Sequence, residues 1–134
     1  MEQKKTMLVV DPDQTVLRVI ELEYGEHYNV MSARSGSEAL NIASNGSTSI
    51  DLVLAEVDLP GNLNGLDLMH QIRKDRPEVP FILTGSGFPR NIVDEDSTYD
   101  ERAKAEGVDY LFKPFIGTEL EAAVAKHLGN GYKQ

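Results

Sequence analysis

The feature that most constrains the fold of this chain is an alternation of short apolar runs with longer segments of helical period. Five runs are typical of strands, at residues 7–10, 28–31, 52–55, 81–83 and 108–112. The first, third and fourth are entirely apolar, which is the pattern of strands buried on both faces. The alternation predicts a doubly wound α/β fold with a parallel sheet, helices on both faces and those three strands at the centre.

Helix signals lie between the runs. Asp11 followed by Pro12 is a favoured helix start, with Asp11 as N-cap and Pro12 as the first helical residue. Ser35 and Glu38 have the spacing of a capping box, and a further amphipathic segment follows Gly65. These signals predict three helices within the first half of the chain.

The second half is less regular. Thr118 and Glu121 repeat the capping spacing before a last helix, which Gly129 can end. Between the fourth and fifth strands, only residues 99–106 have helical propensity, so the helix there is expected to be short and late. The acidic stretch at residues 85–100 reads as a loop.

Composition limits the classes of function. The 134 residues fit one domain, expected over residues 1–134, and the net charge of −9 argues against direct binding to nucleic acid. There is no cysteine, and no apolar run approaches the ~20 residues that cross a bilayer. No secretion signal is visible at the N-terminus, so we expect a cytoplasmic protein without membrane contact.

Polar side chains follow four of the predicted strands. Asp11, Glu56, Thr84 and Lys113 each stand at or just after a strand end. Because parallel strands end at one edge of the sheet, these residues are expected to meet in a cleft there. Two carboxylates favour a hard cation such as Mg²⁺ and the lysine an anion, while the alternative is a structural salt bridge.

The order and rough spacing of several segments resemble the receiver domain of two-component response regulators over nearly the whole chain. These segments are residues 8–11, 51–56, 59–65, 83–85 and 107–115. The resemblance implies a five-stranded parallel sheet of order 2-1-3-4-5, the flavodoxin-like order. It also implies Mg²⁺-dependent transfer of a phosphoryl group from a histidine kinase to an aspartate, with Thr84 and Lys113 at the phosphoryl oxygens and Tyr110 as the switch aromatic.

The residue at the phosphoacceptor position departs from the family. Glu56 stands where the resemblance implies aspartate, and its extra methylene moves the carboxylate toward Lys113 and Thr84, away from the geometry of in-line attack. We therefore predict a receiver that works without phosphorylation, a pseudo-receiver. Glu56 could mimic part of a phosphorylated aspartate, or it could form a static ion pair without consequence for signalling.

The acidic site is also incomplete. Pro12 stands where the family has a second acid, which leaves Asp11 and Glu56 as metal ligands and predicts weak Mg²⁺ binding at best, with no cofactor required. Asp13 could compensate for the missing acid, but the shift by one residue turns its side chain by about 100° around the helix. Asp58 is a further acid near the same loop, and it is expected to be an exposed loop carboxylate.

The expected role is signalling through protein contacts, without enzymatic turnover. The resemblance implies a histidine kinase, an output domain or another regulator as partner, and dimers occur in the family. The alternatives are a working Mg²⁺-dependent phosphoreceiver with an unusual acceptor, and a small α/β enzyme that binds a nucleotide or metabolite. His27, His70 and His127 lack metal-ligand spacing and are expected at the surface.

Overall fold

The computed structural model describes residues 4–86, 108–115 and 117–129. Five strands form one parallel sheet of order β2-β1-β3-β4-β5, which confirms the predicted architecture. The elements are β1 (Thr6–Val10), α1 (Gln14–Tyr24), β2 (Asn29–Ala33), α2 (Gly36–Ala43), β3 (Leu52–Glu56), α3 (Gly65–Asp75), β4 (Phe81–Gly85), β5 (Asp109–Phe112) and α5 (Gly117–Leu128).

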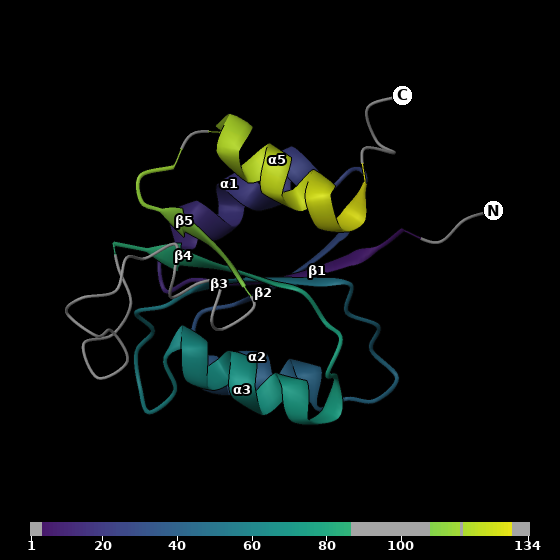
Figure 1. The fold of residues 1–134 in the computed structure, drawn as a ribbon, viewed down its shortest axis with the longest axis vertical. Helices are drawn as coiled ribbons and strands as arrows, with labels where there is room; N and C mark the ends of the chain where they lie inside the picture. The colour runs from purple at the N-terminus through teal and green to yellow at the C-terminus, as the bar shows by residue number, and fades with distance from the viewer. Residues whose placement is uncertain (1–3, 87–107, 116, 130–134) are drawn as a thin grey trace.

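Helices cover both faces of the sheet. Figure 1 shows α2 and α3 on one face and α1 and α5 on the other. Successive residues of a strand point to opposite faces, so Leu8 and Val53 pack in the core beneath α2 and α3, whereas Met7 and Leu52 pack beneath α1 and α5. Every residue of β1, β3 and β4 is buried, which is what the sequence predicts for their apolar runs at residues 7–10, 52–55 and 81–83.

The start of α1 differs from the prediction. The N-cap is Asp13, whose carboxylate accepts from the backbone N–H of Thr15, and the helix begins at Gln14. Asp11 is buried and accepts from the backbone N–H of Asp13 at 2.9 Å, so Pro12 lies in the connection rather than in the helix. The expected Asp11 cap was wrong because the side chain of Asp11 turns into the edge of the sheet.

The other helix ends vary in how well they were predicted. Ser35 caps α2 by accepting from the N–H of Glu38, as expected. The capping box of α3, formed by Asn64 and Asp67, was missed. Thr118 lies inside the first turn of α5 and is not its cap, and the position before this helix falls outside the described residues.

The strand bounds shift by one or two residues. β2 begins at Asn29, β3 includes Glu56 and β4 extends to Gly85. Gly129 follows α5 with a φ of +81°, which fits its predicted role in ending that helix. The helix expected at residues 99–106 and most of the acidic stretch at 85–100 lie outside the described residues.

In the part of the chain that the structure describes, no helix combines the length and apolar character needed to cross a membrane.

Candidate functional site

The four polar residues predicted to meet do lie together at the carboxyl edge of the sheet. Glu56 and Thr84 are register partners at the ends of the adjacent strands β3 and β4. Lys113 directly follows β5, and its backbone N–H donates to the carbonyl oxygen of Gly85 at 2.9 Å. Asp11 follows β1, which pairs with β3 on its other side. The parallel topology therefore gathers residues up to 102 positions apart in sequence.

The side chains form one connected polar cluster. The Nζ of Lys113 lies 2.7 Å from Oδ2 of Asp11 and 3.0 Å from Oε2 of Glu56. The hydroxyl of Thr84 donates to the same Glu56 oxygen at 3.1 Å. Asp11 and Thr84 are each 3% exposed and Glu56 is 8% exposed, so only Lys113 reaches solvent to a sizeable degree. One oxygen of Glu56 thus accepts from both a hydroxyl and an ammonium group.

The lysine is the titrating group that this cluster perturbs. Burial favours the neutral amine and would lower the pKa of Lys113, but hydrogen bonds and ion pairs with Asp11 and Glu56 act in the opposite direction. The carboxylates prevail, and the pKa of Lys113 is raised above the ordinary value for lysine. The ammonium form is therefore held between two acids.

Tyr110 lies close to this cluster. It is partly buried against the core beneath α2 and α3, and its hydroxyl oxygen is enclosed. Its ring meets that of Phe112 edge to face, with centroids 4.9 Å apart. The side chain at the position of the expected switch aromatic is thus directed into the molecule.

The other predicted acids are not part of the cluster. Asp13 is exposed and caps α1, and Asp58 is exposed in the loop after β3. Across residues 4–86, 108–115 and 117–129, no three His, Cys, Asp or Glu side chains form a group that could hold a metal ion. Asp11 and Glu56 each use one carboxylate oxygen to contact the ammonium group of Lys113.

A second charged cluster was not anticipated from the sequence. The carboxylate of Asp109, at the start of β5, lies 2.8 Å from Nζ of Lys126 and 2.7 Å from Nε2 of His127, both on α5. Burial would raise the pKa of Asp109, but its hydrogen bonds and ion pairs with Lys126 and His127 hold it below the ordinary range. His127 is therefore a half-buried partner of β5, whereas His27 and His70 are exposed as expected. No local sequence signal indicates this pairing, because it depends on how α5 packs against β5.

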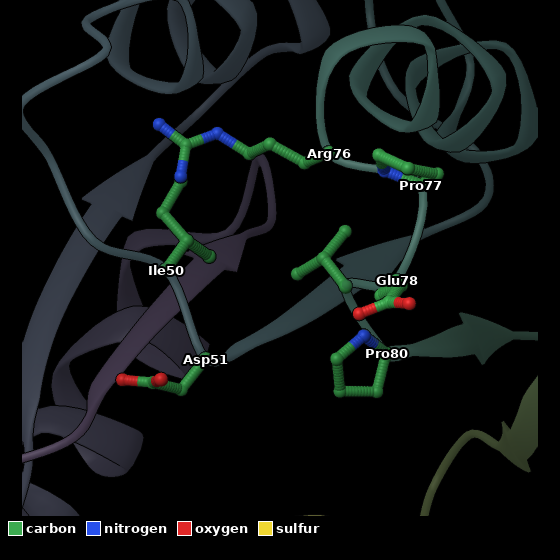
Figure 2. A pocket seen from close by; sticks show the side chains of 7 residues that line it. Ile50, Asp51, Arg76, Pro77, Glu78 and Pro80 are labelled. Carbon is green, nitrogen blue, oxygen red and sulfur yellow. The ribbon is translucent and has the colours of Figure 1, made fainter.

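A hollow of about 400 Å³ lies at the opposite edge of the sheet, shown in Figure 2. It is lined by Ile50, Asp51, Arg76, Pro77, Glu78, Val79 and Pro80. The guanidinium of Arg76 donates to the carbonyl oxygens of Ala43 and Asn45, and therefore serves the C-terminal end of α2. The carboxylate of Asp51 accepts from the N–H of Thr6. The charged groups of Arg76 and Asp51 therefore hold neighbouring segments of the chain together.

Next to Asp11 and Thr84, by contrast, the gap between the side chains has no space for a water molecule. Most of the side chains that line this gap are apolar and belong to the core beneath α1 and α5.

Comparison with known proteins gives consistent results. The response regulator receiver domain family matches residues 7–125. An uncharacterized transcriptional regulatory protein of Bacillus subtilis (strain 168), YkoG, is 37% identical over 134 residues, covering 98% of this chain and 54% of that protein. The response regulator SaeR of Staphylococcus aureus (strain USA300) is 29% identical over 116 residues, covering 85% of this chain and 46% of that protein. The chain thus spans about half the length of these curated relatives.

A solved structure supports the same assignment. The crystal structure of a response regulator receiver domain protein from Clostridium thermocellum superposes with a TM-score of 0.75 at 30% identity, covering 96% of this chain and 97% of that one.

Proposed function

The chain belongs to the response regulator receiver domain family, and we propose that within two-component signalling it acts as a pseudo-receiver, which needs no aspartyl phosphorylation. Receiver domains are signalling domains that interact with histidine kinases and output domains. The proposal concerns how this one reaches its signalling state.

The observation that carries the proposal is the pair of contacts to one oxygen of Glu56. Oε2 of Glu56 accepts from the hydroxyl of Thr84 at 3.1 Å and lies 3.0 Å from Nζ of Lys113. In the family, the threonine and lysine at these positions contact the transferred phosphoryl group. Here a side-chain carboxylate supplies the anionic oxygen to both donors without a transferred group. Glu56 therefore favours an active-like arrangement without a kinase.

The same contacts disfavour Glu56 as a phosphoacceptor. In-line attack on a phosphoryl group depends on the placement of a nucleophilic oxygen with ångström-level accuracy. The Oε2 atom already contacts two donors, and Glu56 as a whole is only 8% exposed. The family's second acid is replaced by Pro12, so Mg²⁺ binding is proposed to be weak and not required.

Information then passes through protein contacts, without catalytic turnover. The proposed partner is a histidine kinase, an output domain or another regulator, as in the family. The net charge of −9 argues against direct contact of this domain with nucleic acid.

The proposal is tested by intact mass after incubation with a small-molecule phosphodonor, with and without Mg²⁺. The protein is expected to show no gain of a phosphoryl group. The Glu56→Asp/Pro12→Asp variant is the matched control, because it restores the acids of the family at both positions. A Mg²⁺-dependent mass gain in the unmodified protein would overturn the proposal, and mapping the labelled residue would then identify the unusual acceptor.

A second measurement separates phosphoryl mimicry from a static ion pair. Glu56→Gln removes the negative charge that faces Thr84 and Lys113, and mimicry predicts a changed environment of Tyr110 by NMR together with weaker binding to the partner. An unchanged Tyr110 signal and unchanged affinity would contradict mimicry and favour the static pair.

A further inference from the structure

Gly85 occupies an unusual position at the end of β4. Its φ is +149°, in the region that favours glycine, and its carbonyl oxygen accepts from the N–H of Lys113 at 2.9 Å. It directly follows Thr84, so it lies between the polar cluster and β5. The backbone of Gly85 is thus linked to Thr84 by the peptide bond and to Lys113 by a hydrogen bond.

The space in which a side chain of residue 85 would stand is already occupied. A Cβ atom built on Gly85 would lie 2.9 Å from the hydroxyl oxygen of Tyr110, 3.3 Å from Oε1 of Glu56 and 3.6 Å from Oε2. Contacts below 3.0 Å between a Cβ atom and another heavy atom require a displacement. Tyr110 and Glu56 therefore both approach the point that the missing methyl group leaves open.

Of the two contacts, the one with Tyr110 is the more restrictive. The three atoms nearest to the added Cβ are the hydroxyl oxygen of Tyr110 and the two carboxylate oxygens of Glu56. All other Tyr110 atoms therefore lie at least 3.6 Å away, and only the hydroxyl oxygen is too close. The Glu56 contact at 3.3 Å can be relieved by a shift of a few tenths of an ångström. The hydroxyl of Tyr110 is enclosed, so its contact with the added Cβ can be relieved only if the tyrosine ring moves.

Movement of the Tyr110 ring would also affect a side chain at the surface. Tyr110 packs edge to face against Phe112, and Phe112 is 40% exposed. Phe112 lies on β5, the edge strand of the sheet. Displacement of Tyr110 would thus remove the support of an exposed apolar ring on a strand edge.

We propose that Gly85 is a positioning residue that holds Tyr110 in its inward position beside Glu56, because the absence of a side chain leaves room for the tyrosine hydroxyl. This inference deepens the proposed function, on which it rests, by adding a residue that controls how the Glu56 cluster is connected to the exposed ring of Phe112. The residue acts through Tyr110 and takes no part in chemistry.

Backbone conformation alone is the competing explanation for a glycine here. Alanine at residue 85 would be strained by the φ of +149° whatever its neighbours. Gly61→Ala is the matched control, because Gly61 has a φ of +87° and nothing within 4 Å of an added Cβ. Tyr110→Phe separates the two causes, because it removes the clashing oxygen and leaves the backbone of residue 85 unchanged.

The experiment compares Gly85→Ala, Gly61→Ala, Tyr110→Phe and the double variant Gly85→Ala/Tyr110→Phe. The chain is labelled with 3-fluorotyrosine, and the ¹⁹F resonance of Tyr110 is assigned as the one lost in Tyr110→Phe. We expect Gly85→Ala to move this resonance and to lower the urea midpoint by more than Gly61→Ala does, because the contact with Tyr110 adds to the backbone strain. The double variant is expected to recover this excess, and the part due to backbone strain is expected to remain. Gly61→Ala is expected to leave the Tyr110 resonance in place.

An unmoved Tyr110 resonance in Gly85→Ala would overturn the inference. So would a Gly85→Ala loss no larger than that of Gly61→Ala, or an excess over Gly61→Ala that Tyr110→Phe does not recover. If Gly85→Ala does not fold, folding of the double variant supports the inference and its failure to fold contradicts it. The intact mass of the unmodified protein after phosphodonor treatment is measured in parallel. A mass gain there contradicts the proposed function alone, whereas the fluorine spectra test Gly85 alone.

Discussion

Replacing Glu56 with Gln should destabilise the domain, although it removes one of two acids that share a buried site. The substitution preserves size and one carbonyl oxygen, and it changes the charge that faces Lys113. Two opposing effects decide the sign. The loss of attraction to Lys113 destabilises the fold, and relief of repulsion from Asp11 stabilises it.

The geometry indicates which effect prevails. At 3.0 Å from Nζ of Lys113, the carboxylate of Glu56 gains about 5 kcal/mol of attraction at an effective dielectric constant near 20. The two carboxylates flank the same Nζ, so they are separated by about 4 to 6 Å, and their repulsion is about 3 to 4 kcal/mol. Attraction wins, and solvent at the 29% exposed lysine reduces the difference. We expect Glu56→Gln to cost about 1 to 2 kcal/mol, within the range for lost charge-assisted hydrogen bonds.

The assay is urea unfolding followed by circular dichroism and tyrosine fluorescence, which is suitable because the chain has no tryptophan. With an m-value of about 1.5 kcal/mol/M, the midpoint should fall by about 1 M at pH 7. Asp58→Asn is the matched control, since it removes one negative charge from an exposed residue of the nearby loop. Its midpoint should change little.

The effect should also depend on pH in a definite direction. The folded-state pKa of Lys113 is raised, so stability from its charge is complete below the ordinary lysine pKa and is lost as pH rises through the raised value. The gap between the unmodified protein and Glu56→Gln should therefore shrink in strong alkali. Equal or greater stability of Glu56→Gln at pH 7, with Asp58→Asn unchanged, would refute the electrostatic reasoning.

Three further predictions test other parts of the molecule. Asp13→Ala should cost about 1 kcal/mol in urea unfolding through loss of the α1 cap, and an equal loss in Gln14→Ala would contradict this. Asp109→Asn should cost about 0.5 to 1 kcal/mol at neutral pH, since solvent screens this pair. Because the pKa of Asp109 is lowered, its contribution is present above the ordinary Asp pKa and lost as pH falls through the lower folded value, so a gap that persists in strong acid would argue against this pairing. Glu56→Asp/Pro12→Asp should bind Mg²⁺ measurably by calorimetry, whereas the unmodified protein is expected to bind it weakly. Failure of the double variant to bind would show that the family's acidic site does not carry over to this edge.

Much of the architecture could be read from local sequence patterns. The entirely apolar runs that became β1, β3 and β4 encode burial on both faces, and the segments between them encode helices. Since parallel strands end at one edge, the placement of Asp11, Glu56, Thr84 and Lys113 after strands was enough to predict that they meet. The strand order came from the family resemblance, and the structure confirmed it.

Side-chain partners could be predicted only in part, because they depend on distances between residues remote in sequence. The length of Glu56 indicated its contacts with Lys113 and Thr84, but the pairing of Asp109 with α5 was missed. Lys113 pairs with Asp11 across 102 positions, and with Asp11 buried in this pair the N-cap of α1 is Asp13. Local propensity favoured Asp11 as the cap, but the tertiary ion pair prevailed.

The role of glycine at residue 85 depends in the same way on the packing of β3, β4 and β5. Periodicity in the chain therefore determines which elements form and which edge collects the polar residues. The register of the assembled strands determines which oxygens face the ammonium of Lys113 and how much space remains for the Tyr110 hydroxyl. Only the tertiary structure decides these contacts, because a shift of the strands by less than an ångström would change them.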